Sequence, residues 1–297
     1  MDPELIVHLD GRLLPCAEAR LSPFDRGFLF GDGVYEGLRA FGGEVVSMQA
    51  HVSRLRASLA GARIEGFKPA SLPDLTAELL IANGLEDAFI YWQISRGVTS
   101  PRHHLPQAEI QPTVFGYAVP AVPLGEITGP SEMQVITQRD ERWLRCDIKS
   151  VSLLPVVLAK LAAEEAGAAE ALMVREAADG SGYVAEGGST NLFCVFGEGE
   201  AAQIVTPPIG RLMLQGVTRD LLLHVHHGIS ERPIRREELR EASEVILCGT
   251  STFVAAVTAI DGERVGAGCG GPVTQHLFEL AARAVRDGTH AKVVYRT

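Results

Sequence analysis

The chain has 297 residues, 46% of them apolar and 22% charged, which is enough for one large domain or two ordinary ones. The formal net charge of -10 disfavours non-specific nucleic-acid binding, and no apolar run approaches the roughly 20 residues that span a bilayer. Acidic residues in the N-terminal stretch MDPELIVHLDGRLL argue against a secretory leader, and the five scattered cysteines favour reduced thiols, so we expect a cytoplasmic protein.

The first 119 residues are expected to form a small domain of mixed helices and strands. Residues 5–14 predict two short strands around an Asp10-Gly11 turn, and the Gly-rich stretch 27–46 predicts further strands and tight turns. Apolar residues at helical spacing predict a helix over 51–62. The remaining elements expected in this part are a helix at 72–83 and strands at 89–95 and 113–119.

Three prolines and two glycines in PAVPLGEITGP predict a linker over 120–130, which would separate domain 1–119 from a larger domain 131–297. In the larger part, Pro155 and Gly167 delimit a predicted helix at 152–166. One face of that helix carries Leu154, Val157, Leu158 and Leu161. The other expected elements are strands at 133–137, 169–175, 191–196, 203–206 and 244–248 and helices at 217–227, 235–242 and 273–286. This mixture favours two α+β domains with a ligand cleft between them.

The chain contains only four lysines, so chemistry that needs a primary amine has few candidates. Lys149 lies in WLRCDIKSVSLLP among apolar neighbours, where partial burial would favour the neutral, nucleophilic amine that forms Schiff bases. The alternative is a lysine that reaches solvent. The other three, Lys68, Lys160 and Lys292, lie in a loop, on a predicted helix and near the C-terminus.

Three segments of the second half carry polar groups in suggestive places. Glu186 in AEGGSTNLF is a carboxylate that could keep a pyridine nitrogen protonated, although a turn with an exposed acid has the same pattern. GVTRD (216–220) opens a predicted helix, and backbone amides at a helix start bind phosphate. GTST (249–252) offers hydroxyls and amides for the same purpose. An ordinary helix cap and a Ser/Thr turn are the alternatives for these two segments.

The loop SRGVTSPRHHLP (95–106) contains Arg96, Arg102, His103 and His104, and cations of this kind bind carboxylates. A solvated polar loop is the alternative, and we expect no metal site because the histidines lack further ligands at metal-binding spacing. Together the signals provide an amine, a ring-nitrogen partner, phosphate donors and a carboxylate trap. That combination predicts an enzyme that uses pyridoxal 5'-phosphate (PLP) to act on amino acids.

These segments also carry a resemblance. The sequence resembles the class IV (fold type IV) PLP-dependent aminotransferases, and within them the D-amino-acid transaminases, along its whole length. The matching segments are RGFLFGDGVYEGLRAF, AHVSRL, SRGVTSPRHHLP, ERWLRCDIKSVSLLPVVLAKLAA, AEGGSTNLF, GVTRD and GTST. The resemblance implies an α+β fold with a small N-terminal α/β domain and a larger, β-barrel-like C-terminal domain with flanking helices. It also implies a homodimer with the active site near the dimer interface.

The resemblance assigns roles to individual residues. Lys149 matches the lysine that binds the cofactor and moves the substrate proton, and Glu186 matches the acid that pairs with the pyridine nitrogen. The residues that match phosphate ligands are Arg54, Val217, Thr218, Thr250 and Ser251. The residues that match the trap for the substrate carboxylate are Tyr35, Arg102 and His104.

The implied reaction is a ping-pong transfer of the amino group of a D-amino acid, such as D-alanine, to a 2-oxo acid. EGLRAF (36–41) and TFVAAV (252–257) look more like branched-chain aminotransferases, so the alternatives are a branched-chain L-amino-acid transaminase and an (R)-amine transaminase. A lyase acting on aminodeoxychorismate is a weaker alternative. A non-catalytic PLP-binding protein is the alternative from a different class. The PRHH loop favours the D-amino-acid interpretation.

Overall fold

The computed structural model describes residues 4–106, 109–176 and 181–295 and divides into two compact units. Unit 1 comprises Met1–Glu126, Ile148–Ser152 and Val294–Thr297, and unit 2 comprises Ile127–Asp147 and Leu153–Val293. The chain first leaves unit 1 after Glu126, within the predicted linker 120–130. Each unit contains helices and a sheet of its own, so the predicted α+β class is confirmed. Among the described residues, no helix combines the length and apolar character needed to cross a bilayer.

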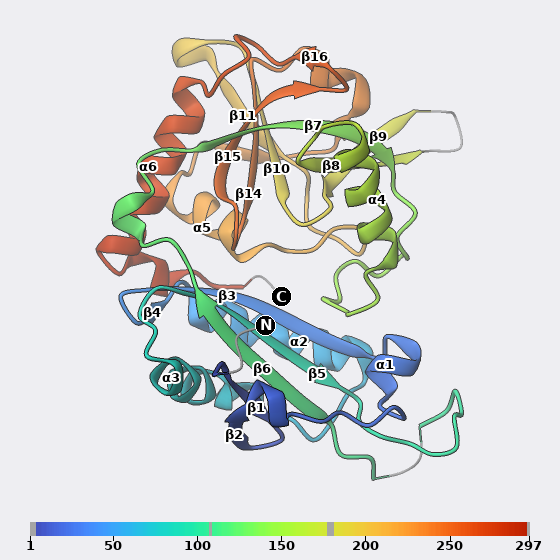
Figure 1. Ribbon diagram of the computed structural model, residues 1–297. Helices are drawn as coiled ribbons and strands as arrows, with labels where there is room; N and C mark the ends of the chain where they lie inside the picture. Colours follow the sequence, from blue (N-terminus) through green and yellow to red (C-terminus); the bar gives the residue numbers. More distant parts are fainter. Residues whose placement is uncertain (1–3, 107–108, 177–180, 296–297) are drawn as a thin grey trace. The chain divides into compact units, whose positions relative to one another are not determined.

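Unit 1 is built on a six-stranded antiparallel sheet in the order β2-β1-β6-β5-β3-β4. Helix α2 packs against β3, and α3 packs against β1 and β6 (Figure 1). The elements are β1 (Ile6–Leu9), β2 (Arg12–Pro15), α1 (Arg26–Phe30), β3 (Gly33–Phe41), β4 (Glu44–Val45), α2 (Met48–Ala62), α3 (Leu72–Asn83), β5 (Ala88–Ser95) and β6 (Thr113–Pro120).

The core of unit 1 follows the alternation of its strands. Val34 and Leu38 on β3 and Trp92 on β5 point to the face that the helices cover, and all three are fully buried. The Trp92 indole N–H donates to Thr76 Oγ1 on α3 at 3.0 Å, so its polar atom is paired inside the core.

Helix α1 stands where the Gly-rich pattern predicted strands and tight turns, and that part of the prediction is wrong. The side chain of Asp25 caps the helix by accepting from the Gly27 amide at 2.8 Å, and Gly31 ends it in the left-handed region at φ 65°. A helix of five residues is too short for an apolar period to reveal it.

Unit 2 is built on a ten-stranded mixed sheet in the order β12-β11-β10-β14-β15-β7-β8-β9-β13, with β16 paired to β15. Three neighbouring pairs are parallel: β15 with β7, β7 with β8, and β11 with β12. The elements are β7 (Ser131–Arg139), α4 (Leu154–Glu165), β8 (Glu170–Glu176), β9 (Gly182–Gly187), β10 (Asn191–Phe196), β11 (Gln203–Thr206), α5 (Val217–Val225), β12 (Ile229–Glu231), β13 (Ile234–Arg235), β14 (Glu244–Gly249), β15 (Phe253–Ile260), β16 (Glu263–Arg264) and α6 (Pro272–Arg286).

One expectation for unit 2 changes, and the apolar face of α4 lies away from the core. The helix expected over 235–242 is a short 3-10 helix, η5 (Arg236–Arg240). The apolar stripe of α4 does not face the sheet, because Leu154, Val157, Leu158 and Leu161 are between 48% and 68% exposed. Instead Ala159 and Ala163 are buried with residues of β8, since small side chains let the helix lie close to the strands.

Candidate active-site residues in the two units

Lys149 belongs to unit 1, in the short segment 148–152 that runs beside the start of β3. Its backbone is held on both sides: its carbonyl accepts from the Tyr35 amide at 2.9 Å, and its amide donates to Ser58 Oγ on α2 at 3.1 Å. The Lys149 Nζ lies 4.3 Å from the centre of the Tyr35 ring. Unit 1 therefore brings together two residues that the sequence predicted separately.

Tyr35 begins a row of aromatic rings across the sheet of unit 1. Its ring stacks on Tyr91 with centroids 5.6 Å apart, and Tyr91 lies 5.4 Å from Tyr117. Burial raises the pKa of Tyr91, helped by Tyr35 and Tyr117, and its hydroxyl donates to Gln93 Oε1 at 2.9 Å. The row therefore supports the Tyr35 ring through the Tyr91 ring, which stays uncharged at neutral pH.

Arg54 on α2 is buried in a three-residue ionic cluster with Glu36 and His51. Its Nε and Nη2 donate to the two carboxylate oxygens of Glu36 at 2.9 and 2.7 Å, and His51 Nδ1 lies 2.7 Å from Glu36 Oε2. Burial alone would raise the pKa of Glu36, but the Arg54 charge and the hydrogen bonds from Arg54 and His51 lower it to about 2. Burial lowers the pKa of His51, which favours its neutral form. The cluster fixes the plane of the Arg54 guanidinium.

The PRHH loop is held by a different arginine. The guanidinium of Arg26 donates to the carbonyls of His103 and His104 at 2.7 and 2.9 Å. The Phe30 ring lies 4.4 Å from Arg102 Cζ and 5.5 Å from the His104 ring, measured to the ring centre. The side chains of residues 101–106 are exposed, and within the described part of the chain no hydrogen bond or ring contact joins them to the lysine–tyrosine pair.

Glu186 lies near the end of β9 in unit 2, and it is only 4% exposed. Its carboxylate accepts from Arg142 Nη1 at 2.5 Å, from Asn191 Nδ2 at 3.1 Å and from the Leu214 amide at 3.1 Å. Arg142 is in turn held by Asp140 through two hydrogen bonds of 2.9 and 2.8 Å. Burial would lower the pKa of Arg142, but Asp140 and Glu186 outweigh it and raise the pKa. The result is a fixed carboxylate beside a permanent cation.

The predicted phosphate ligands of unit 2 surround the same segment, 186–191. Helix α5 begins after Gly216 without a side-chain cap, so the amides of its first turn have no side-chain acceptor at the cap. A Cβ on Gly216 would lie 1.8 Å from Asn191 Oδ1, so the helix start is pressed against Asn191. At the end of β14, a Cβ on Gly249 would lie 3.2 Å from the Ser189 carbonyl, which places the Thr250–Ser251 turn next to this segment. An uncapped helix start beside hydroxyl groups suits a phosphate group.

Several of these polar contacts were not expected from the sequence. Glu36, His51 and Ser58 hold the unit 1 residues, and Arg142 and Asn191 hold Glu186. Arg142 and Asn191 lie in ERWLRC and AEGGSTNLF, two of the segments that carry the family resemblance. Their roles depend on contacts between segments, for which the sequence carries no local signal.

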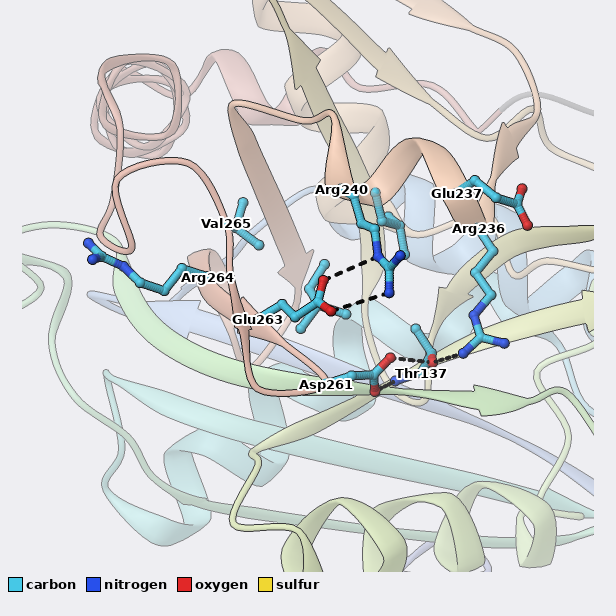
Figure 2. Close-up of a pocket in the computed structure, with 10 residues that line it drawn as sticks. Thr137, Arg236, Glu237, Arg240, Asp261, Glu263, Arg264 and Val265 are labelled. Atoms are coloured by element: carbon cyan, nitrogen blue, oxygen red, sulfur yellow. Dashed lines mark hydrogen bonds and ion pairs between the residues drawn. The ribbon is translucent and has the colours of Figure 1, made fainter.

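Unit 2 also has a cavity of about 310 Å³ that is lined by none of the predicted site residues. Figure 2 shows that Arg240 pairs with Glu263 in this cavity and that Asp261 accepts from Thr137 Oγ1 at 2.7 Å. Arg236 also donates to Thr137 Oγ1, at 3.1 Å. These pairs hold the surface around η5 and β16 together.

Comparison with known proteins gives a consistent picture. Residues 33–260 match the family model of amino-transferase class IV. The chain is 36% identical to the D-alanine aminotransferase of Bacillus licheniformis over 97% of this chain and 99% of that protein. It is 35% identical to the D-alanine aminotransferase of Staphylococcus haemolyticus over 92% of this chain and 95% of that protein.

Among solved structures, the branched-chain aminotransferase of Thermoproteus uzoniensis with norvaline is similar, with a TM-score of 0.81, 26% identity and 97% of each chain covered. A second branched-chain amino acid aminotransferase, solved with pyridoxamine 5'-phosphate, is similar with a TM-score of 0.85. It is 27% identical, and the match covers 98% of each chain. The fold is therefore shared with branched-chain enzymes, while the sequence is more similar to D-alanine enzymes.

Proposed function

This chain belongs to the class IV aminotransferases, and from that premise we propose that it transfers the amino group of a D-amino acid, such as D-alanine, to a 2-oxo acid. The observation that carries the proposal is the 36% identity to a D-alanine aminotransferase over nearly the whole of both chains. The transfer takes place in two half-reactions, in which the amino group is first held by the enzyme and then passed to the 2-oxo acid.

We propose PLP as the cofactor, because a structure similar to this one was solved with pyridoxamine 5'-phosphate. When bound, PLP supplies a ring that withdraws electrons from the bonds at the substrate α-carbon. Within unit 2 the residues present fit such a group: a buried carboxylate at Glu186 for the ring nitrogen and an uncapped helix start at Val217–Thr218 for the phosphate. Lys149 of unit 1 is proposed to supply the amine. The Thr250–Ser251 hydroxyls of unit 2 and Arg54 of unit 1 are proposed as further phosphate ligands.

The chain's own residues would divide the work as follows. Lys149 Nζ would hold the cofactor and then accept and return the α-proton as a general base. The Tyr35 ring, 4.3 Å away, would limit the positions that this amine can take. Glu186 would direct its carboxylate to the ring nitrogen, because Arg142 and Asn191 fix the orientation of that carboxylate.

The substrate carboxylate is proposed to bind to Tyr35, Arg102 and His104. This assignment follows from the resemblance of the PRHH loop to D-amino-acid transaminases. The side chains of Arg102 and His104 are exposed, and Arg26 fixes the backbone at His103 and His104, which suits the capture of an anion from solution. Substituting Arg102 with Leu should raise KM for D-alanine far more than it changes the binding of PLP.

A homodimer is proposed from the family, and the exposed apolar stripe of α4 supports an association between chains. Light scattering after size-exclusion chromatography would measure the mass of the particle in solution, which should be that of two chains. A cytoplasmic location is also proposed. All five cysteines lie among the described residues and are free thiols, and three of them, Cys146, Cys194 and Cys248, are buried.

A branched-chain L-amino-acid transaminase is the second candidate, since the solved structure with a TM-score of 0.85 is of that kind. Initial rates with D-alanine, L-leucine and (R)-1-phenylethylamine would separate the candidates. We expect D-alanine to be the fastest, and a much faster reaction of L-leucine would refute the substrate assignment. A protein that binds PLP but shows no spectral change with any amine would be a binder and not an enzyme.

The lysine assignment has a direct test. Reduction of the PLP-loaded protein with borohydride and peptide mapping should place the label on Lys149. A Lys149→Ala protein should lose transamination by about 10³-fold or more, as expected when a covalent catalyst is removed. A label on any of the other lysines would contradict the assignment.

A further inference from the structure

Glu170, the first residue of β8, is a buried carboxylate that the proposed chemistry does not use. It is 1% exposed and accepts hydrogen bonds from two directions. Its Oε2 accepts from the Ser189 amide at 3.2 Å and hydroxyl at 2.9 Å, and lies 3.4 Å from Thr190 Oγ1. Its Oε1 accepts from the Ala171 amide at 2.9 Å and pairs with Lys160 Nζ of α4 at 3.0 Å. One carboxylate thus joins β8, α4 and the turn between β9 and β10.

That turn, residues 187–190, fits closely around the carboxylate. A Cβ added to Gly188 would lie 3.0 Å from Glu170 Oε1, and a Cβ on Gly187 would lie 2.1 Å from Thr190 Oγ1. The two glycines are therefore required by the close approach of the turn to Glu170 and to its own threonine. Main-chain bonds close the turn further, with the Gly187 amide donating to the Thr190 carbonyl at 2.8 Å.

The turn lies between Glu186, the proposed partner of the ring nitrogen, and Asn191, which holds it. Glu186 precedes it, Asn191 follows it, and their side chains are joined by a hydrogen bond of 3.1 Å. Asn191 also donates to the Leu214 carbonyl at 3.0 Å, just before the start of α5. A change in the turn would move Glu186 and Asn191 relative to each other.

We propose that Glu170 is a positioning residue of the cofactor site: it fixes the 187–190 turn and through it the carboxylate of Glu186. The inference rests on the proposed use of PLP. The carboxylate of Glu170 is essential, because it accepts on both oxygens, whereas a glutamine has one acceptor oxygen and an NH₂ group that only donates. In Glu170→Gln, either the turn or the Ala171–Lys160 side would face a donor instead of an acceptor.

The chain offers a matched control in Glu244, at the start of β14. It is also a buried carboxylate, and it accepts from the Val273 and Thr274 amides and the Thr274 hydroxyl at the start of α6. Glu244→Gln makes the same chemical change in the same sheet. In the strand register, Glu244 pairs with Val195 and Asn191 pairs with Cys248, so the control lies at the opposite end of β14 from Asn191.

The experiment compares the PLP-loaded wild-type protein, Glu170→Gln and Glu244→Gln. Both variants should lower Tm by a few degrees. Only Glu170→Gln should speed amide exchange in the peptide covering 186–191 and raise the PLP dissociation constant by about tenfold, the effect of losing one hydrogen bond to a charged group. It should also shift the pH titration of the bound cofactor's visible band, which a loss of general stability does not move.

Two results would overturn the inference. One is a Glu170→Gln protein in which the amides of residues 186–191 exchange at the same rate as in the wild type. The other is a PLP affinity and visible band altered no more than in Glu244→Gln. A wild-type protein that fails to bind PLP would refute the proposed function and this inference together, whereas normal wild-type binding with an unaffected Glu170→Gln would refute the inference alone.

Discussion

Lys149 Nζ and the ring of Tyr35 lie 4.3 Å apart in unit 1, and a main-chain hydrogen bond of 2.9 Å joins the same two residues. The pair joins β3 to the segment 148–152, two parts of the chain that are distant in sequence. The main-chain contact keeps the two residues next to each other.

Tyr35 should contribute its ring and its hydroxyl to different steps. Tyr35→Phe keeps the ring beside Lys149, so the visible band of bound PLP should stay unchanged while KM for D-alanine rises by about tenfold through loss of a hydrogen bond to the carboxylate. Tyr35→Ala also removes the ring, and the visible band should shift with pH differently from the wild type. Equal KM values for Tyr35→Phe and the wild type would remove the hydroxyl from the trap.

The Glu36–Arg54 pair should make unit 1 sensitive to acid. The pKa of Glu36 is lowered from 4.5 to about 2 in the folded protein, so as the pH falls the unfolded chain binds this proton first. Its stabilisation is therefore present above about pH 4.5 and is lost between about pH 4.5 and 2. Denaturant unfolding across this range should show a steeper loss for the wild type than for Glu36→Gln. Parallel curves would contradict the assignment.

Arg142 should be necessary for the stability of unit 2 as long as both of its partners are charged. Arg142→Met leaves Asp140 and Glu186 buried without this cation, which should lower the free energy of unfolding by about 3 kcal/mol. The same change made in Glu186→Gln should cost less than half as much, because one of the two carboxylates is already neutral. Urea denaturation of the four proteins measures the coupling, and additive losses would show that the pair is not coupled.

Gly216 should be required for the start of α5. Gly216→Ala places a Cβ 1.8 Å from Asn191 Oδ1, so the helix start or Asn191 must move, at a cost of about 1–3 kcal/mol. The affinity for PLP should fall with it. Gly210→Ala is the control, since a Cβ there would meet no atom within 4 Å. Thermal unfolding and PLP titration of both variants check the prediction, which is wrong if the two behave alike.

Local patterns in the sequence are sufficient to predict many elements. The helix predicted at 72–83 matches α3, and the strands predicted at 191–196 and 203–206 match β10 and β11. Strand β15 is not among the predicted elements, because its two faces are both buried and its apolar run FVAAVTAI lacks the alternation of a half-exposed strand. Strand β9 is also missing from them, since its residues GYVAEG resemble a turn.

For the candidate site, the sequence supplies residue types but not their partners. The resemblance names Glu186 and Arg54, yet the groups that orient them, Arg142 and Glu36, follow only from the three-dimensional contacts. The exposed stripe of α4 illustrates the same limit: helical spacing shows that four apolar residues share a face, but not whether that face meets the sheet.

The return of residues 148–152 to unit 1 has a practical consequence for anyone who dissects this protein. A fragment that begins at Ile127 would contain Lys149 but neither β3 nor the Ser58 hydroxyl that hold it, and a fragment that ends at Glu126 would contain those supports without the lysine. Truncation would thus separate the Lys149 amine from the residues that hold it. A chimera that exchanges units between relatives would therefore need residues 148–152 from the same parent as unit 1.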